Sequence, residues 1–193
     1  MSDVAGECFQ YALFFLNTVS LTYTPLILNP VSTASGYFAG DPFTDYFIGV
    51  KSIKINENFV PLNTSLLSIN TEGYGGTKIS TADPYTVMET TIYNAVIDTF
   101  VEELAKANVP RVASVATFGA CFNSKNIVGT RGGPAVPQID VVLQSKSVYW
   151  RIFGANSTVQ VKNAVLCLGF VDGGAKPRTS IVIGGHQLEN NLL

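Results

Sequence analysis

The chain is organised around one segment, Gly75-Gly76-Thr77-Lys78-Ile79-Ser80-Thr81-Ala82-Asp83-Pro84. Paired glycines open it, a short strand-like run follows, and a turn at Asp83-Pro84 closes it. Residues 90–106 then carry the strongest helical pattern in the sequence, because apolar side chains recur there at spacings of three and four. These side chains are Ile92, Ala95, Val96, Phe100 and Leu104. We therefore expect a strand, a tight loop and a long helix in succession, with the other strands packed around them.

The rest of the chain is expected to be mostly β-strand. Residues 46–55 alternate apolar and polar side chains, and residues 56–58 turn the chain back into residues 59–62, which predicts a hairpin. Residues 65–69 fit either a strand or one turn of helix. Further strands are expected at residues 21–24, 139–143, 148–153, 158–161, 164–170 and 180–185, with loops at residues 32–42, 123–137 and 173–177.

The composition is typical of a single secreted β-domain. The chain has 193 residues, of which 47% are apolar and 13% charged. Its 12 Lys and Arg residues are scattered and nearly balanced by 14 Asp and Glu, so we expect neither nucleic acid nor an anionic membrane as a partner. The apolar residues 11–16 follow a leader that contains Asp3 and Glu7 but no Lys or Arg, so they do not predict a working signal peptide.

The cysteine and histidine content argues against a metal site. Three cysteines without Cys-x-x-Cys spacing and a single histidine do not predict zinc, and no motif predicts a cofactor. Cys121 and Cys167 each lie in apolar, strand-like sequence, so we expect them to form a disulfide and Cys8 to stay free. Closing a loop of roughly 46 residues would stabilise the fold by about 4 kcal/mol in the chain-entropy model.

The central segment resembles the second active-site segment of pepsin-like aspartic proteases, in which a small apolar strand presents Asp-Ser/Thr-Gly-Thr/Ser before a turn and a helix. On that pattern Ser80 stands where the family has its catalytic Asp, Thr81 matches, and Ala82 replaces the Gly. Aspartic proteolysis needs two carboxylates that share one proton, and a serine hydroxyl titrates far too high to replace either. The sequence contains neither Asp-Thr-Gly nor Asp-Ser-Gly. The resemblance therefore implies a protease frame without a catalytic dyad.

Longer stretches narrow the resemblance to one plant group. Residues 46–50 are similar to the segment that opens the C-terminal lobe of plant pepsin-like proteins. Residues 50–56, 76–81 and 179–188 are similar to the extracellular dermal glycoprotein group, which contains the xyloglucan-specific endoglucanase inhibitor proteins and is related to basic 7S globulins and wheat-type xylanase inhibitors. The resemblance implies a mainly β fold, the C-terminal lobe of a bilobal pepsin-like aspartic protease fold, with one principal helix near residues 90–106. Residues 21–193 would form this lobe, of the xylanase-inhibitor C-terminal type and truncated at its C-terminus. Residues 1–20 match nothing in the family, and the N-terminal lobe is expected in a full-length parent.

The resemblance implies a function without catalysis. We expect an inactive protease homologue that inhibits microbial cell-wall-degrading glycoside hydrolases, of the endoglucanase or xyloglucanase type, in plant defence. It would act outside the cell, in the apoplast or cell wall. Two alternatives stay open: an aspartic-type endopeptidase, as the fold suggests, and a storage or binding protein like the basic 7S globulins.

Arg131 is the candidate inhibitory contact. It is flanked by Gly132, Gly133 and Pro134 in a long polar loop, so we expect it at an exposed tip. A retaining endoglucanase carries two catalytic carboxylates about 5 Å apart, and a guanidinium fork pairs bidentately with such groups. The resemblance supports this interpretation, because inhibitors of the family act through loops of this lobe. The alternative is an ordinary solvated surface arginine.

Other polar residues allow functional and structural interpretations. Asn63 and Asn156 begin glycosylation sequons. Ser80 and Lys78 would face the same side of a strand, as in a Ser/Lys nucleophile pair, but we expect the Ser80 hydroxyl to hydrogen-bond locally instead. We expect a structural role for His186 and a turn or capping role for Asp83.

The sequence also predicts how the isolated lobe behaves. Without a second lobe, Ile79 and residues 182–184 would form an exposed apolar strip. Residues 181–183 would lie at an open sheet edge, since the family has further strands after them. We therefore expect the isolated chain to be marginally stable or to aggregate, and to inhibit glycanases poorly.

Overall fold

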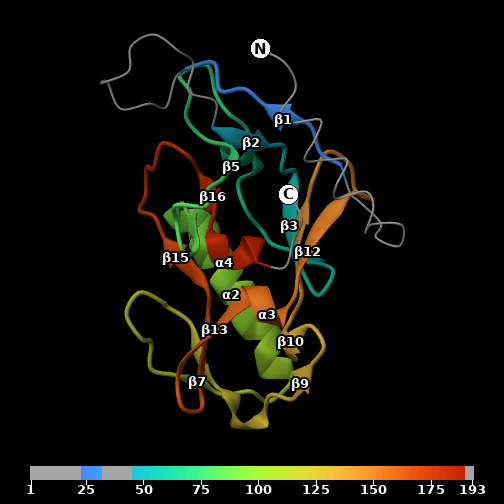
Figure 1. Cartoon of the computed structure of the whole chain (residues 1–193), viewed down its shortest axis with the longest axis vertical. Helices are drawn as coiled ribbons and strands as arrows, with labels where there is room; N and C mark the ends of the chain where they lie inside the picture. Colours follow the sequence, from blue (N-terminus) through green and yellow to red (C-terminus); the bar gives the residue numbers. More distant parts are fainter. Residues whose placement is uncertain (1–22, 32–44, 190–193) are drawn as a thin grey trace, which may run out of the picture.

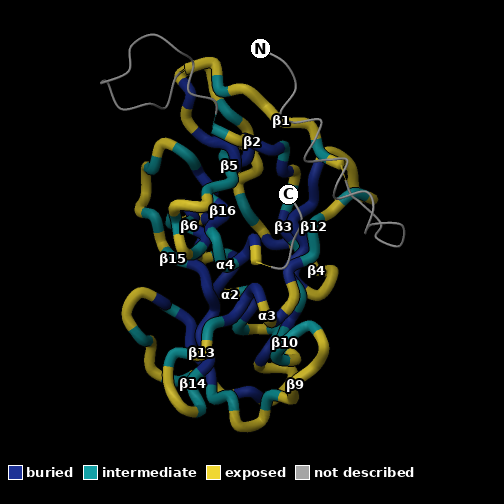
Figure 2. Tube along the Cα trace, viewed as in Figure 1, coloured by how far each residue is buried: buried dark blue, intermediate teal, exposed yellow. Residues whose placement is uncertain are grey.

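The computed structural model describes residues 23–31 and 45–189, and it is mainly β-strand with one long helix. Figure 1 shows the helix α2 running through the middle of the molecule, with strands above and below it. Buried stretches follow the inner strands, and exposed stretches follow the outer loops (Figure 2). Within the described ranges, no helix is long and apolar enough to cross a bilayer.

The central segment lies inside a six-stranded sheet whose order is β1-β2-β5-β16-β6-β15. Strand β5 is parallel to β16 and antiparallel to β2, and β6 is antiparallel to β16 and parallel to β15. The segment therefore contributes a strand with a neighbour on each side. The bounds are β1 Leu26–Ile27, β2 Tyr46–Ile48, β5 Thr77–Ile79, β6 Thr86–Met88, β15 Phe170–Asp172 and β16 Ile181–Ile183.

Three smaller sheets complete the β-structure. They have the orders β12-β11-β3-β4, β13-β14-β8-β7 and β10-β9. The first contains β3 Ser52–Ile55, β4 Asn58–Phe59, β11 Ile139–Val142 and β12 Tyr149–Ile152. The second contains β7 Arg111–Val112, β8 Cys121–Asn123, β13 Thr158–Lys162 and β14 Val165–Leu168, and the third contains β9 Gly129–Thr130 and β10 Gly133–Pro134. Short helices are η1 Thr64–Leu67, η2 Ser124–Asn126, α3 Gly154–Ser157 and α4 Gly185–Leu188.

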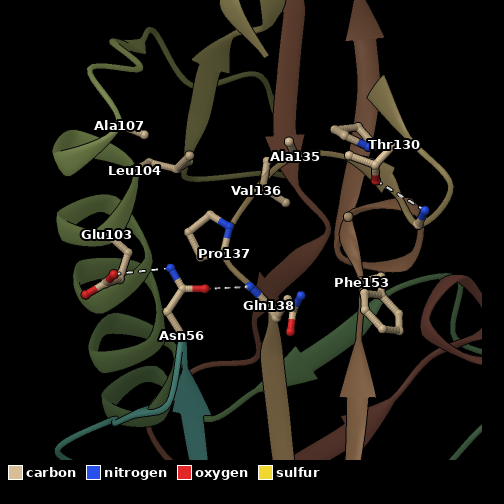
Figure 3. A pocket seen from close by; sticks show the side chains of 13 residues that line it. Asn56, Glu103, Leu104, Ala107, Thr130, Ala135, Val136, Pro137, Gln138 and Phe153 are labelled. Carbon is tan, nitrogen blue, oxygen red and sulfur yellow. Dashed lines mark hydrogen bonds between the residues drawn. The ribbon is translucent and has the colours of Figure 1, made fainter. Parts of the chain in front are cut away.

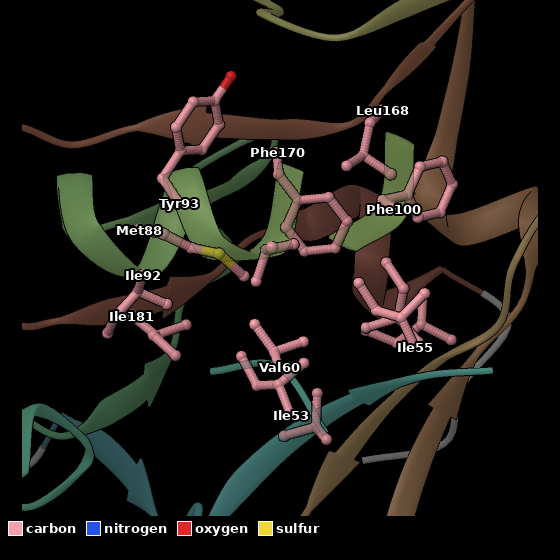
Figure 4. Packing of buried hydrophobic residues seen from close by; sticks show 14 of the residues in the cluster. Ile53, Ile55, Val60, Met88, Ile92, Tyr93, Phe100, Leu168, Phe170 and Ile181 are labelled. Carbon is pink, nitrogen blue, oxygen red and sulfur yellow. The ribbon is translucent and has the colours of Figure 1, made fainter. Parts of the chain in front are cut away.

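The long helix α2 spans Thr90–Lys106, which confirms the principal helix predicted from the apolar spacing. The carboxylate of Glu89 caps its first turn by accepting hydrogen bonds from the backbone N–H groups of Thr91 and Ile92. The apolar face of the helix packs into the main core with side chains from several sheets (Figure 4). This core includes Ile53, Ile55, Met88, Ile92, Phe100, Leu168, Phe170 and Ile181.

Tyr93 joins α2 to the loop before β8, because its hydroxyl accepts a hydrogen bond from the backbone N–H of Gly119 at 3.1 Å. Burial raises the pKa of Tyr93 above its ordinary value of 10.0. A raised folded-state pKa means that the stability is fully present below the unfolded pKa and is lost as pH rises through the folded pKa.

Above pH 10 we expect the free energy of unfolding to fall less steeply with pH in Tyr93→Phe than in the unaltered chain. The reason is that the variant lacks the buried phenol whose ionisation favours the unfolded state. At neutral pH the same change should cost about 1 kcal/mol, since the N–H of Gly119 loses its acceptor. Urea unfolding between neutral pH and pH 11 measures both effects. Tyr46→Phe, at an exposed tyrosine, is the control, and parallel pH curves for Tyr93→Phe and the unaltered chain would contradict the prediction.

The hairpin between β3 and β4 turns through Asn56 and Glu57, which both have positive φ, 46° and 69°. This is the left-handed conformation that a two-residue hairpin turn requires and that a residue with a Cβ rarely adopts. The turn predicted at residues 56–58 is therefore present, with Glu57 in an unfavourable backbone conformation.

Replacing Glu57 by glycine should stabilise the fold by about 0.5 kcal/mol, because relief of the positive φ exceeds the extra entropy of glycine in the unfolded chain. Chemical denaturation measures the change. Glu57→Ala is the matched control, since it removes the same carboxylate but keeps a Cβ. Equal effects of the two variants would show that the backbone is not the cause.

Several predicted elements differ from the structure. The segment 164–170 is two strands in different sheets, because the chain leaves one sheet for the other at Gly169. Strands β6, β7, β9 and β10 were not predicted, and each has only two or three residues. Strand β8 lies in the strand-like sequence around Cys121. Near the N-terminus, the strand expected at residues 21–24 is wrong for residues 23 and 24, which are not strand, and the first strand is Leu26–Ile27. Residues 21 and 22 lie outside the described residues.

The expectation of an open edge at residues 181–183 is wrong. Strand β16 lies between β5 and β6 in the six-stranded sheet, and Ile181, Ile183 and Gly184 are buried. The exposed apolar side chains of this sheet instead lie at β1, where Leu26 and Ile27 are exposed. The tight turn after β5 allows this arrangement, since it returns the chain to the other side of β16.

Candidate functional site

The loop after β5 begins at Ser80, the residue that the sequence resemblance aligns with a catalytic Asp. The backbone N–H of Ser80 donates to the carbonyl of Ile183 on β16 at 2.9 Å. The Ser80 Oγ accepts a hydrogen bond from the backbone N–H of Asp83 at 3.4 Å. The hydroxyl thus makes a local bond that shapes the loop, and the position carries no carboxylate.

The first residues of helix α4 fix the end of this loop through backbone hydrogen bonds. The backbone N–H groups of Gly185 and His186 donate to the carbonyls of Asp83 and Pro84 at 2.7 and 2.9 Å. Gly184 crosses the loop so closely that a Cβ there would lie 2.3 Å from the carbonyl carbon of Tyr85. The Asp83-Pro84 turn is therefore built into the packing and is not free to rearrange.

The structure does not assemble a nucleophile at Ser80. The ammonium of Lys78 lies 3.4 Å from the carboxylate of Asp45, and both side chains are partly buried. The imidazole Nε2 of His186 lies 3.0 Å from the carbonyl oxygen of Thr158, in a structural contact. Neither side chain is paired with the Ser80 hydroxyl among the described residues, so no general base is aligned with it.

A buried amide holds α4 against the neighbouring elements. The side-chain oxygen of Gln187 accepts hydrogen bonds from the N–H and the hydroxyl of Thr86 at 2.9 and 2.8 Å. Its side-chain nitrogen donates to the carbonyls of Asn156 and Gly169, both at 3.0 Å. Gln187 is fully buried, so these four bonds replace all contact with water. This residue could not be identified from the sequence, because a lone glutamine carries no signal of burial.

Arg131 lies at the tip of the hairpin formed by β9 and β10, where it is exposed. The Thr130 hydroxyl donates to the carbonyl of Gly133 at 2.7 Å and accepts from the N–H of Gly132 at 3.2 Å. The backbone N–H of Ala155 in α3 donates to the carbonyl of Gly132 at 2.8 Å, which ties the tip to the body of the molecule. Within the part of the chain that the structure describes, no side chain pairs with the Arg131 guanidinium. Among the described residues, the guanidinium is therefore an unpaired cation on a fixed turn.

Gly133 sets the approach of this hairpin to α3. It has φ +92°, and a Cβ there would lie 2.3 Å from the backbone nitrogen of Ala155. Only glycine fits both the conformation and the contact. The Gly132-Gly133 pair therefore holds the Arg131 turn against α3 while leaving Arg131 exposed.

The two sequons differ in their surroundings. Asn63 is exposed, and its side-chain oxygen accepts from the N–H of Ser65 at 3.1 Å. Asn156 is 9% exposed, and its side-chain nitrogen donates to the carbonyls of His186 and Glu189 at 3.0 and 2.7 Å. That nitrogen is the atom to which a glycan would be attached, so the expectation of a glycan on Asn156 does not fit the folded chain.

Cys121 and Cys167 form a disulfide with an S–S distance of 2.04 Å. They are opposite each other on the neighbouring strands β8 and β14, where both are fully buried beside Phe118. Cys8 lies outside the described residues. In the described ranges, no three His, Cys, Asp or Glu side chains gather into a group that could hold a metal ion.

Comparisons with known proteins give a consistent result. The family model described as "Xylanase inhibitor C-terminal" matches residues 45–193. A probable aspartic proteinase, GIP2, of Nicotiana benthamiana is 66% identical over 172 residues, which cover 89% of this chain and 39% of that protein. Gamma conglutin 1 of Prunus dulcis is 44% identical over 175 residues, covering 88% of this chain and 39% of that protein.

Solved structures agree with these relatives. The crystal structure of edgp superposes with a TM-score of 0.85 at 63% identity, over 88% of this chain and 41% of that one. Basic 7S globulin from soybean superposes with a TM-score of 0.66 at 34% identity, over 87% of this chain and 39% of that one. Both matched structures have the pepsin-like fold. This chain therefore spans about two fifths of the length of the proteins it matches.

Proposed function

The chain belongs to the xylanase inhibitor C-terminal family and has a pepsin-like fold, and from this premise we propose that it inhibits microbial cell-wall-degrading glycoside hydrolases. The enzymes would be of the endoglucanase or xyloglucanase type, and inhibition would serve plant defence. The observation that carries the proposal is the exposed guanidinium of Arg131, which has no partner in the described ranges and stands on a fixed hairpin. The protein acts by occupying a cleft and carries out no reaction itself.

Arg131 suits the chemistry of such a cleft. A retaining glycosidase holds two carboxylates about 5 Å apart, and the planar guanidinium offers two parallel N–H donors to a carboxylate. The bonds of Thr130 and Ala155 to the turn fix its backbone before binding, so little backbone entropy is lost in the complex. A carboxylate held by this arginine is not available as an acid, base or nucleophile.

Catalysis by the chain itself is the competing function. One relative is named a probable aspartic proteinase, and the loop after β5 keeps the frame of such an enzyme. Ser80 replaces the required carboxylate, and its hydroxyl is bonded to the backbone of Asp83. A second lobe in a longer parent would supply at most one carboxylate of the two that the reaction needs. We therefore propose that the protein is a protease homologue without peptidase activity.

Two assays on a longer parent protein that joins this chain to an N-terminal lobe test the proposal. The first measures residual activity of retaining and inverting endoglucanases and xyloglucanases after incubation with that parent protein, and the isolated chain is tested beside it. The second follows cleavage of peptides at acid pH, with and without pepstatin. We expect inhibition of at least one retaining glycanase and no cleavage. Pepstatin-sensitive cleavage would favour the endopeptidase, and an effect on none of the glycanases would favour a storage or binding globulin.

We further propose an extracellular location, in the apoplast or cell wall, with a glycan on Asn63. The side-chain nitrogen of Asn63 makes no hydrogen bond within the described residues, whereas that of Asn156 makes two. A glycosidase that removes N-linked glycans should lower the mass of the secreted chain by the mass of one glycan. Asn63→Gln should abolish this change and Asn156→Gln should not, and the reverse pattern would contradict the assignment.

A further inference from the structure

We infer that a trough along the C-terminal half of α2 is a binding site for an uncharged oligosaccharide. Two cavities, of about 360 and about 590 Å³, meet at Glu103, which lines both of them. Figure 3 shows the first cavity between α2 and the β9–β10 hairpin. We define the Glu103 trough by Phe153, Gln138, Asn56, Glu103, Asn58 and Phe59.

The middle of the trough is a fixed set of hydrogen-bonding groups. The side-chain nitrogens of Asn56 and Asn58 donate to the two carboxylate oxygens of Glu103 at 3.2 and 3.0 Å, and the ammonium of Lys106 donates as well. These bonds lower the pKa of Glu103, and the hydrogen bond from Lys106 makes the largest contribution. The carboxylate therefore remains an acceptor below its ordinary titration range. A carboxylate has about four lone-pair sites, so three donors leave room for a hydroxyl.

Gln138 adds a free amide to this wall. Its backbone N–H donates to the Asn56 side-chain oxygen at 3.2 Å, which fixes its position. Its side-chain amide makes no hydrogen bond with any described residue, and Figure 3 shows it between Asn56 and Phe153. An amide both donates and accepts, as a sugar hydroxyl does, so it can pair with such a group in either direction.

An exposed aromatic ring lies in each cavity. Phe153 is 45% exposed in the first cavity, and Phe59 is 55% exposed in the second. Large apolar side chains left open to water at a cavity indicate a binding surface. A pyranose ring presents its C–H bonds on its faces and its hydroxyls at its edge. The ammonium of Lys54 lies over one face of the Phe59 ring, 4.6 Å from its centroid, so a sugar would stack on the other face. Stacking there and on Phe153 while the edge meets Glu103 and Gln138 satisfies both sets of groups.

The charges of the trough favour a neutral ligand. Lys106 is the cation of the lining, and it is paired with Glu103, so the middle of the trough has no free charge for an anion. Asp98 and Glu102 line only the second cavity. A basic peptide would be held at that end alone and would leave Phe153 and Gln138 without partners.

Saturation-transfer NMR and isothermal titration calorimetry of the full chain with cellohexaose and xylohexaose test the site. We expect at least one of these oligosaccharides to bind. Phe153→Ala and Gln138→Ala should each weaken binding about tenfold, corresponding to about 1.4 kcal/mol. Tyr149→Ala is the matched control, because Tyr149 is 40% exposed at the start of β12, the strand that leads into Phe153, but lies outside the trough, and it should change nothing. Phe153→Leu keeps the local packing if the alanine variant fails to fold.

The inference does not depend on the proposed inhibition, and the measurements separate the two. The binding measurements contain no glycanase, and Arg131→Ala should leave oligosaccharide binding unchanged. Failure of both hexasaccharides to bind the unaltered chain would overturn the inference, as would binding that survives both Phe153→Leu and Gln138→Ala. Displacement of a bound oligosaccharide by decalysine would overturn its neutral-ligand class in favour of a basic peptide.

Discussion

Replacing Arg131 by alanine is expected to weaken inhibition of a retaining endoglucanase at least about a hundredfold while leaving the stability of the chain unchanged. Truncating one member of a buried, hydrogen-bonded charge pair costs about 2–5 kcal/mol, because the partner charge stays buried without a counter-ion. The side chain makes no hydrogen bond or ion pair within the described residues, so the folded chain loses nothing. Inhibition constants and a thermal melt measure the two effects.

Two further variants make this result specific. Arg131→Lys keeps the charge and removes the planar fork, so it should retain only part of the inhibition. Lys176→Ala removes an exposed cation from a different loop and should have no effect. Equal losses for Lys176→Ala and Arg131→Ala would show that only the net charge of the protein matters. Full inhibition by Arg131→Ala would remove this residue from the site.

Gln187→Leu is expected to lower the free energy of unfolding by about 3–5 kcal/mol. The change keeps the volume but leaves two donors of Thr86 and the carbonyls of Asn156 and Gly169 without their partner in a fully buried position. A buried polar group without a partner costs about 1–3 kcal/mol, and partial rearrangement reduces the sum. Urea unfolding of the oxidised chain measures the effect.

An exposed glutamine provides the matched control. Gln160 also donates its amide to two backbone carbonyls, those of Lys162 and Val165, but water can replace it. Gln160→Leu should therefore cost less than about 1 kcal/mol. Similar losses for the two variants would mean that burial does not determine the importance of Gln187.

The parts of the fold that local sequence specifies were predictable. Apolar spacing gives the long helix its bounds, and Glu89 and Lys106 suit its two ends. The paired glycines and Asp83-Pro84 identify the strand and turn of the central segment. The tip position of Arg131 follows from its glycine neighbours, since these residues favour a tight turn.

Features that depend on distant segments could not be predicted in this way. Asn156 has the sequence of a glycan acceptor, but residues about thirty positions later bury it and bond its side-chain nitrogen. Glu103 looks like an ordinary solvated helix charge, although Asn56 and Asn58 of a hairpin more than forty residues earlier hold its carboxylate. In both cases the local pattern is correct and the tertiary contact decides the role.

A double-mutant cycle between Arg131 and the catalytic carboxylates of an inhibited retaining endoglucanase tests the central claim most directly. Arg131→Ala in the chain is combined with replacement of each catalytic carboxylate by its amide in the enzyme, and calorimetry gives the binding free energies of all pairs. The proposed contact predicts a coupling energy of at least about 1.5 kcal/mol with one of the carboxylates. Additive free energies with both carboxylates would show that Arg131 does not enter the catalytic site.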